Sequence, residues 1–294
     1  MPSASAPAIQ GAAIPSATPD PARPRGLSRR IARLATACLH RELATYPKPG
    51  LVSHVDSGSH SDMDAGRFRA SADALEPFFA ELAEAGAAGA EMAHLRRIGL
   101  AAEAAMRAAT GGVNTHRGAI FGLGLLSAAA GASGMRPAAG SLGAHVRARH
   151  ADAILDGPEL LHAPGARARR RHGVGGAPAE AAAGFPSLYG TGLPALRRAR
   201  ALRPDAPEAA RVEACLALVA CLEDTNLLHR GGPEGYAFAR AEAARFIAAG
   251  GIAPDDWFSR AEALHRAFVA RRLSPGGAAD LLAMTLFVDA WERP

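Results

Sequence analysis

The chain has 294 residues, which is long enough to bury one large core or two smaller ones. Its formal net charge of +5 suits a polyanionic small molecule or a nucleic acid, or reflects only a compositional preference for arginine. Aromatic residues make up 5% of the chain, too few for a platform that stacks single-stranded nucleic acid, so we expect no nucleic-acid partner. Cys38, Cys215 and Cys221 are odd in number and form no CxxC pair, which argues against a disulfide framework or a zinc site and favours a reducing cytoplasm.

Residues 1–26 are rich in proline, alanine and serine and lack the apolar core of a signal peptide, so we expect a disordered N-terminal tail there. After this tail, strand patterns are nearly absent and helical periodicity recurs. The sequence therefore predicts one all-α catalytic domain over 27–294, folded as a single multi-helix, bundle-like unit. Either a monomer or an oligomer is compatible with it.

The first helix is expected within 27–46, and its apolar stripe continues to Glu42. A carboxylate on such a stripe must face a partner or a site. The uncharged run 118–135 is diluted by glycine, alanine and serine, which favours a buried helix over a membrane span. Segment 156–191 is rich in glycine, proline and arginine and is expected to form a long loop. Further helices are expected at about 65–85, 92–109, 116–130, 138–154, 207–229, 234–248, 255–271 and 276–291.

Lys48 is the only lysine of the chain, and it lies between Pro47 and Pro49. A P-loop requires Gly-Lys-Ser/Thr and a protein kinase requires Val-Ala-Ile-Lys, so both classes are excluded. The two prolines stiffen the segment, and an ammonium group is more compact than a guanidinium group. We therefore expect Lys48 to present a small positive charge to a phosphate in a narrow pocket.

The next stretch, GSHSDMD, contains His60, Asp62 and Asp64. Carboxylates two residues apart are suitable ligands for Mg²⁺. They are equally suitable as N-caps of the helix expected from about residue 65. Both interpretations stay open at this point.

The stretch TGGVNTHRGAIF leads into another expected helix, which Asn114 or Thr115 can cap. His116 and Arg117 would then lie in its first turn. Positive side chains there oppose the helix dipole, and a bound anion would relieve this conflict. An ordinary capped helix with solvated charges is the alternative, and we favour the anion site.

In CLEDTNLLHRGG, the apolar stripe of the expected helix places Glu223, Asn226 and either His229 or Arg230 near the buried side. Polar residues on such a stripe indicate a site or a buried hydrogen-bonded network. A solvated helix end explains His229 and Arg230 equally well, but it does not explain Glu223 and Asn226.

Asp280 also lies on an apolar stripe, together with Met284 and Phe287. Glu42, Glu223 and Asp280 would therefore point inward from separate helices. This arrangement predicts a polar, metal-bearing pocket in the centre of the bundle.

The blocks PKPGLV, GSHSDMD, GVNTHRGAIF, GFP, NLLHRGG and SPGGAADLLA, in this order, resemble the triphosphoribosyl-dephospho-coenzyme A synthase family. The stretches 45–64 and 109–126 look closer to its malonate decarboxylase branch than to its citrate lyase branch. The resemblance covers about 30–291 and implies a reaction in which ATP and 3′-dephospho-coenzyme A yield a 2′-triphosphoribosyl derivative and adenine. The product would be the precursor of a prosthetic group that a holo-acyl-carrier-protein synthase later attaches.

This reaction requires a clamp for a triphosphate that is not cleaved, anionic groups near a developing oxocarbenium ion, and a base for the 2′-hydroxyl. Asp280 is the weaker choice for this base. The residues expected to bind ATP and its triphosphate are Lys48, Asn114, Thr115, His116, Arg117, His172, His229 and Arg230. The residues expected to bind Mg²⁺ are His60, Asp62 and Asp64, and those expected in catalysis are Glu42, Glu223, Asp224 and Asp280.

Two other functions fit the same residues. An all-α pocket of carboxylates would also serve a Mg²⁺-dependent hydrolase of nucleotides or ADP-ribose. A helical module that binds a nucleotide without turnover is the second alternative.

Overall fold

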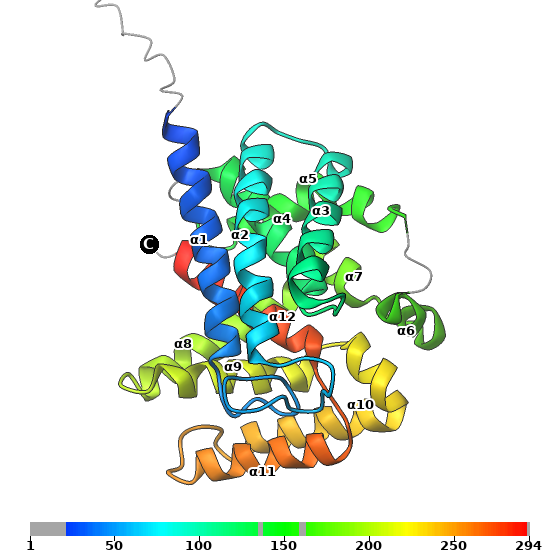
Figure 1. Cartoon of the computed structure of the whole chain (residues 1–294). Helices are drawn as coiled ribbons and strands as arrows, with labels where there is room; N and C mark the ends of the chain where they lie inside the picture. The colour runs from blue at the N-terminus through cyan, green and yellow to red at the C-terminus, as the bar shows by residue number, and fades with distance from the viewer. Residues whose placement is uncertain (1–21, 135–137, 159–162, 293–294) are drawn as a thin grey trace, which may run out of the picture.

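The computed structural model describes residues 22–134, 138–158 and 163–292, and within them every regular element is helical (Figure 1). The predicted all-α fold is confirmed for these residues. None of the described helices is long and apolar enough to cross a membrane. The elements are α1 Ala22–Leu43, α2 Ala65–Ala87, α3 Met92–Thr110, α4 Arg117–Ser133, α5 Ser141–Leu155, α6 Pro164–His172, α7 Gly176–Ala182, the π-helical turn η1 Leu188–Gly192, α8 Leu193–Leu202, α9 Pro207–Cys221, α10 Thr225–Ala248, α11 Trp257–Ala270 and α12 Gly276–Trp291.

Helix α4 is the centre of the fold, and its packing depends on glycine. It contacts α1, α2, α3, α5 and α12, and most of its residues are buried. A Cβ added at Gly86 of α2 would overlap the backbone of Ala128 in α4. Because Gly86 has no side chain, the backbone of α2 can lie directly against the backbone of α4 at this point. The uncharged run 118–135 is thus largely the buried helix that the sequence predicted.

Helices α4 and α12 run side by side in the same direction. Gly118 lies against Asp280 and, one turn further along both helices, Gly122 lies against Met284. The N-termini of the two helices are therefore at the same end of the pair.

Segment 156–191 is not the long loop that its composition predicted. Its described part contains α6, α7 and η1. Pro164 stands in the first turn of α6, and Gly173 ends that helix in the left-handed conformation, with φ of 66°. The local signals of a helix were therefore present, but the segment's glycine, proline and arginine content obscured them.

The expected helix 207–229 is two elements. Helix α9 ends at Cys221, and α10 begins at Thr225 with Asp224 as its N-cap. Helix α10 then continues to Ala248 through a kink at Gly232, which is where the sequence predicted a gap. At the N-terminus, residues 1–21 of the expected tail lie outside the described residues, and α1 already begins at Ala22.

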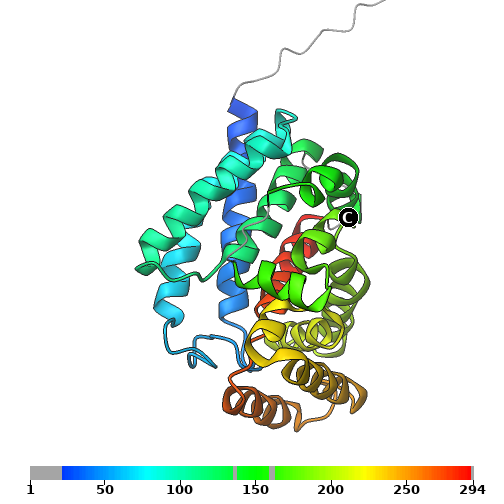
Figure 2. The same ribbon diagram turned by 90° about the vertical axis from the view of Figure 1, so that its right-hand side faces the viewer.

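The loop between α1 and α2 lies at the end of the molecule that α10 and α11 occupy (Figures 1 and 2). Ring nitrogen Nδ1 of His265, on α11, is 2.7 Å from the carbonyl oxygen of Lys48. The other ring nitrogen is 3.2 Å from the Asp56 carboxylate. Ser59 Oγ donates to the carbonyl of Leu273 at 2.6 Å. These contacts fix the proline-rich loop against the body of the protein.

Candidate active site

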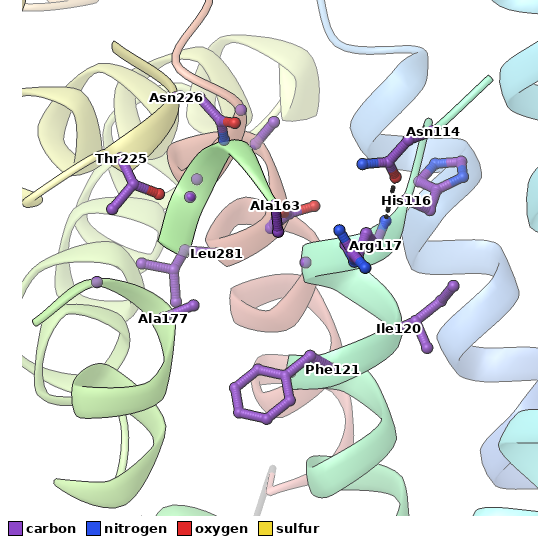
Figure 3. A pocket seen from close by; sticks show the side chains of 18 of the residues that line it. Asn114, His116, Arg117, Ile120, Phe121, Ala163, Ala177, Thr225, Asn226 and Leu281 are labelled. Carbon is purple, nitrogen blue, oxygen red and sulfur yellow. Dashed lines mark hydrogen bonds between the residues drawn. The ribbon is translucent and has the colours of Figure 1, made fainter. Parts of the chain in front are cut away.

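A cavity of about 710 Å³ opens in the middle of the helices (Figure 3). Its volume is typical of sites for small molecules and cofactors. Its wall includes the end of α1, the N-terminal turns of α4, α10 and α12, residues of α3, α6 and α7, and part of the loop before α2. Most of the motifs singled out in the sequence therefore meet around one space.

The N-termini of α4, α10 and α12 are joined at this cavity by two carboxylates. Asp224 accepts hydrogen bonds from the backbone N–H groups of Asn226 and Leu227 in α10, at 2.8 and 3.2 Å, and from Ala278 in α12, at 3.1 Å. Asp280 lies in the second turn of α12 and accepts a hydrogen bond from the N–H of Ala119 in α4. Since the N-terminus of a helix carries partial positive charge, their meeting creates a site that favours anions.

We call Glu42, Asp224 and Asp280 the cavity floor. Burial raises the pKa of each of these carboxyl groups. The shift is largest for Asp280, whose pKa lies well above its usual value because of burial and the nearby charges of Glu42 and Asp224. Hydrogen bonds from the backbone oppose the shift at Asp224, and the ammonium of Lys48 opposes it at Glu42. The prediction that Glu42 faces a partner or a site is met by its ion pair with Lys48, and Glu42 also lines the cavity.

Lys48 lies behind this floor. Its side chain is 0% exposed and forms an ion pair with Glu42, which is itself 4% exposed. Glu42 lines the cavity, whereas Lys48 does not. The expected direct approach of the ammonium to a phosphate is therefore not the arrangement found, and Lys48 acts on the cavity through the carboxylate of Glu42.

His116 is buried in the cavity wall, and it is neutral. Burial, together with the charges of Lys48 and His40, lowers its pKa to about 3. Thr115 Oγ1 donates to Ser71 Oγ at 2.8 Å, and Ser71 Oγ lies 2.7 Å from His116 Nδ1. Because Ser71 Oγ accepts from Thr115, its own proton is donated to Nδ1 of His116. The neutral ring therefore carries its proton on Nε2. Within the part of the chain that the structure describes, Nε2 has no hydrogen-bond partner.

The N-cap residue of α4 is His116 and not Asn114 or Thr115 as the sequence predicted, but Asn114 bonds the first turn from two residues earlier. Its Oδ1 accepts the backbone N–H of Arg117 at 3.2 Å (Figure 3). The Arg117 guanidinium lines the cavity and lies 3.1 Å from Glu103 of α3. Arg117 is therefore an oriented cation at the N-terminus of α4, whereas His116 adds only a hydrogen-bond donor.

The rim segment, residues 60–64, resolves the choice between metal ligand and cap for Asp64. Its Oδ1 accepts the N–H of Arg67 at 2.9 Å, which makes it the N-cap of α2, and it does not line the cavity. Asp62 and His60 do line the cavity, 3.6 Å apart, and the Asp62 side chain is 61% exposed. Among the described residues, no group of three or more His, Cys, Asp or Glu side chains has the geometry of a metal site.

The second half of the wall comes from the segment around α10. Glu223 is exposed and accepts the N–H of Gly175 at 3.1 Å, so it is not on the buried face that a continuous helix would have given it. Arg230 donates to the carbonyls of Ser59 and Arg272, at 2.6 and 2.9 Å, which connects α10 to the rim. His229 is largely exposed, and partial desolvation followed by the charges of Arg167 and Arg230 lowers its pKa.

The chain is related to proteins of one named family. The CitG model, described as ATP:dephospho-CoA triphosphoribosyl transferase, matches residues 28–294. The chain belongs to this family. A relative from Stutzerimonas stutzeri, named a probable 2-(5''-triphosphoribosyl)-3'-dephosphocoenzyme-A synthase, is 44% identical over 89% of this chain and 91% of its own. Relatives with the same name from Azotobacter vinelandii and Pseudomonas putida are 44% and 41% identical, over 90% and 92% of this chain and 92% and 98% of their own. No solved structure matches the chain.

Membership of the ATP:dephospho-CoA triphosphoribosyl transferase family agrees with the resemblance seen in the sequence motifs.

Of the residues expected at the site, Lys48, Asp64 and His172 are the ones that do not line the cavity. His172 is the last residue of α6.

Sequence reasoning missed the residues that support the site from α2 and α3. Ser71 orients His116, Glu103 pairs with Arg117, and Arg96 lines the cavity. Arg96 and Glu103 lie seven positions apart on α3, so they share one face, and their charge on an alanine-rich helix was the available signal. Nothing local marks Ser71, because its partner is distant in the chain.

Proposed function

We propose that this protein transfers the 5-triphosphoribosyl group of ATP to the 2′-hydroxyl of 3′-dephospho-coenzyme A and releases adenine. Family membership supports this activity, and so do the names of relatives that cover most of the chain. The observation that carries the proposal is the meeting of three helix N-termini with buried carboxylates in one cavity. Such a site holds a polyphosphate and also provides negative charge near a ribose.

The reaction forms a bond between the acceptor 2′-oxygen and C1′ of the ATP ribose. The C1′–N9 bond breaks, and adenine leaves with the bonding electrons and takes up a proton. Asp280 accepts the proton of the 2′-hydroxyl, because its raised pKa brings it closer to neutral pH, where a base is most effective. Glu42 stabilises the positive charge that develops at C1′.

The triphosphate binds at the N-terminus of α4, with Arg117 as a charged ligand and the His116 N–H as a neutral donor. Arg230 and His229, from α10, also line the cavity. Lys48 holds the Glu42 carboxylate in place from behind. Asn114 and Thr115 keep this turn in shape through Arg117 and Ser71.

Mg²⁺ fits the rim through Asp62. This carboxylate is largely exposed and lines the cavity, and Mg²⁺ commonly binds one or two carboxylates together with substrate phosphates. Asp64 does not fit, because its carboxylate is the cap of α2. When bound, Mg²⁺ would neutralise charge on the triphosphate and orient it.

The product would serve as the prosthetic-group precursor for the acyl carrier subunit of malonate decarboxylase. The basis is the residues of the motifs at 45–64 and 109–126. A holo-acyl-carrier-protein synthase would use the product, in the cytoplasm.

The test is chromatography of adenine released from ATP and Mg²⁺, with and without 3′-dephospho-coenzyme A. Adenine that forms only when both substrates are present supports the proposal. ADP, AMP or free phosphate would indicate a hydrolase instead. Binding of ATP without turnover would indicate a binding module.

A further inference from the structure

The cavity has two halves of different chemistry. The polar half lies at the N-termini of α4, α10 and α12. The other half follows α4 away from its N-terminus, and between Arg117 and Leu125 this helix rises about 12 Å at 1.5 Å per residue. We call this half the apolar arm, and it is lined by Leu95, Gly99, Ile120, Phe121, Leu125 and Ile154, with the charged side chains of Arg96 and Glu103 one turn on either side of Gly99.

The arm comes from one face each of α3, α4 and α5. On α3, positions 95 and 99 are one turn apart, so they share a face. On α4, Ile120 and Phe121 directly follow the polar first turn (Figure 3). The same helix therefore connects the anion site to the arm.

Gly99 leaves open space inside the arm. A Cβ added there would meet no heavy atom within 4 Å. Leu100, the next residue, also lines the cavity and is 51% exposed. Large apolar side chains thus border a space that the protein itself does not fill, which is typical of a ligand-binding surface.

We propose that the apolar arm holds the pantetheine chain of 3′-dephospho-coenzyme A, an inference that rests on the proposed function. Both substrates contain an adenosine 5′-phosphate unit, and the part that ATP lacks is the long pantetheine chain, whose methyl and methylene groups are separated by two amides. The acceptor 2′-hydroxyl must reach Asp280 in the polar half. Its 5′-linked chain then extends along α4, where apolar surface is removed from water on binding.

Gly99 allows this assignment to be tested with little risk to the fold. Gly99→Ala and Gly99→Leu add volume to open space, and both remove a helix-weakening glycine from α3. We expect Gly99→Leu to raise the KM for 3′-dephospho-coenzyme A by roughly tenfold or more, the effect of misfitting a hydrophobic pocket by a few carbon atoms. The KM for ATP should stay within about twofold. Gly99→Ala should give a smaller change in the same direction.

Ala101→Leu is the matched control. It adds the same side chain to the same helix at an exposed position that does not line the cavity, and we expect both KM values to stay at the wild-type level. Phe121→Ala is a second probe. It widens the arm and should raise the KM for 3′-dephospho-coenzyme A without changing the KM for ATP. Thermal unfolding of each variant shows that it is folded.

Two results would overturn the assignment. An unchanged KM for both substrates in Gly99→Leu would show that the arm is empty during the reaction. A KM for ATP that rises as much as that for the acceptor would place the nucleotide donor in the arm. A wild-type enzyme that releases no adenine would contradict the proposed function itself, which separates the two failures.

Discussion

The cavity floor and the rim segment both carry carboxylates beside the same cavity, but they differ in how far these carboxylates are exposed to solvent. On the floor, Glu42 and Asp224 are 4% and 1% exposed, and burial raises their pKa values and that of Asp280. On the rim, the Asp62 side chain is 61% exposed. A buried carboxylate is suited to take up a proton, whereas an exposed one is suited to share a hydrated cation. The residue type alone therefore does not determine its chemistry.

The largest effect is expected from Asp280→Asn. Removal of a general base should lower kcat by roughly 10²–10⁴-fold, because the 2′-hydroxyl loses its proton acceptor. Since the pKa of Asp280 is raised, wild-type kcat should increase with pH, and this increase should occur at a pH above the usual pKa range of aspartate. Adenine release measured against pH checks both points. A variant with wild-type kcat, or a flat profile, would remove Asp280 from the reaction.

The same substitution should stabilise the protein at high pH. Asp280 ionises at a lower pH in the unfolded state than in the folded state, so the folded state loses stability as pH rises through the raised pKa. Asp280→Asn removes this loss. Its Tm should exceed that of the wild type by more at pH 8 than at pH 5, whereas a purely structural role would lower Tm at both.

Lys48→Met should destabilise the fold by about 3–5 kcal/mol, because it leaves the Glu42 carboxylate buried without its partner. Replacing both residues, as Lys48→Met with Glu42→Gln, should recover part of that loss. Urea unfolding measures the difference. Lys48→Arg keeps the charge but enlarges a side chain that is 0% exposed, and full activity and stability in this variant would contradict the need for a compact cation.

Asp224→Ala should cost roughly 1–4 kcal/mol, since one carboxylate serves the first turns of both α10 and α12 and each cap contributes about 0.5–2 kcal/mol. Asp64→Ala is the matched case on the rim, with one cap, and should cost about 1 kcal/mol. Denaturant unfolding of the two variants compares floor and rim directly. Equal losses in the two variants would mean that the hydrogen bond from α12 to Asp224 does not stabilise the protein.

The smallest effect on stability is expected from Asp62→Asn. Its carboxylate is exposed, so Tm should change by less than the equivalent of about 0.5 kcal/mol. The Mg²⁺ concentration for half-maximal activity should rise by roughly tenfold, because one anionic ligand is lost. A titration of Mg²⁺ at fixed ATP measures this. An unchanged requirement would mean that the rim does not bind the ion.

Most helices could be predicted from the sequence because their apolar periodicity is strong and their ends carry ordinary signals. The break at 222–224 was missed because Leu222 continues the apolar stripe of α9 across the end of the helix. Asp224 was a visible N-cap signal, but it competed with this periodicity. The consequence was that Glu223 was predicted to be buried, whereas Asp224 is the buried carboxylate.

The site shows a similar limit. That Lys48 and Glu42 are unusual could be seen in the sequence, but not that they pair with each other, because this depends on how the loop folds back against α11. The two proline residues indicate a stiff loop without indicating which side of it faces the core. The lowered pKa of His116 likewise depends on the tertiary structure, first through burial and then through the charge of Lys48, a residue far away in the chain.

The contact between Gly118 and Asp280 limits how far the carboxylate at position 280 can extend towards α4. A methyl group at position 118 would overlap the Asp280 carboxylate, so any other residue there would force this carboxylate to turn away from α4. A glutamate at position 280 would extend one methylene further into the same backbone and would have to turn its carboxylate away from Ala119. The glycine at position 118 therefore makes room for the Asp280 carboxylate, and substitutions at the two positions are expected to be coupled.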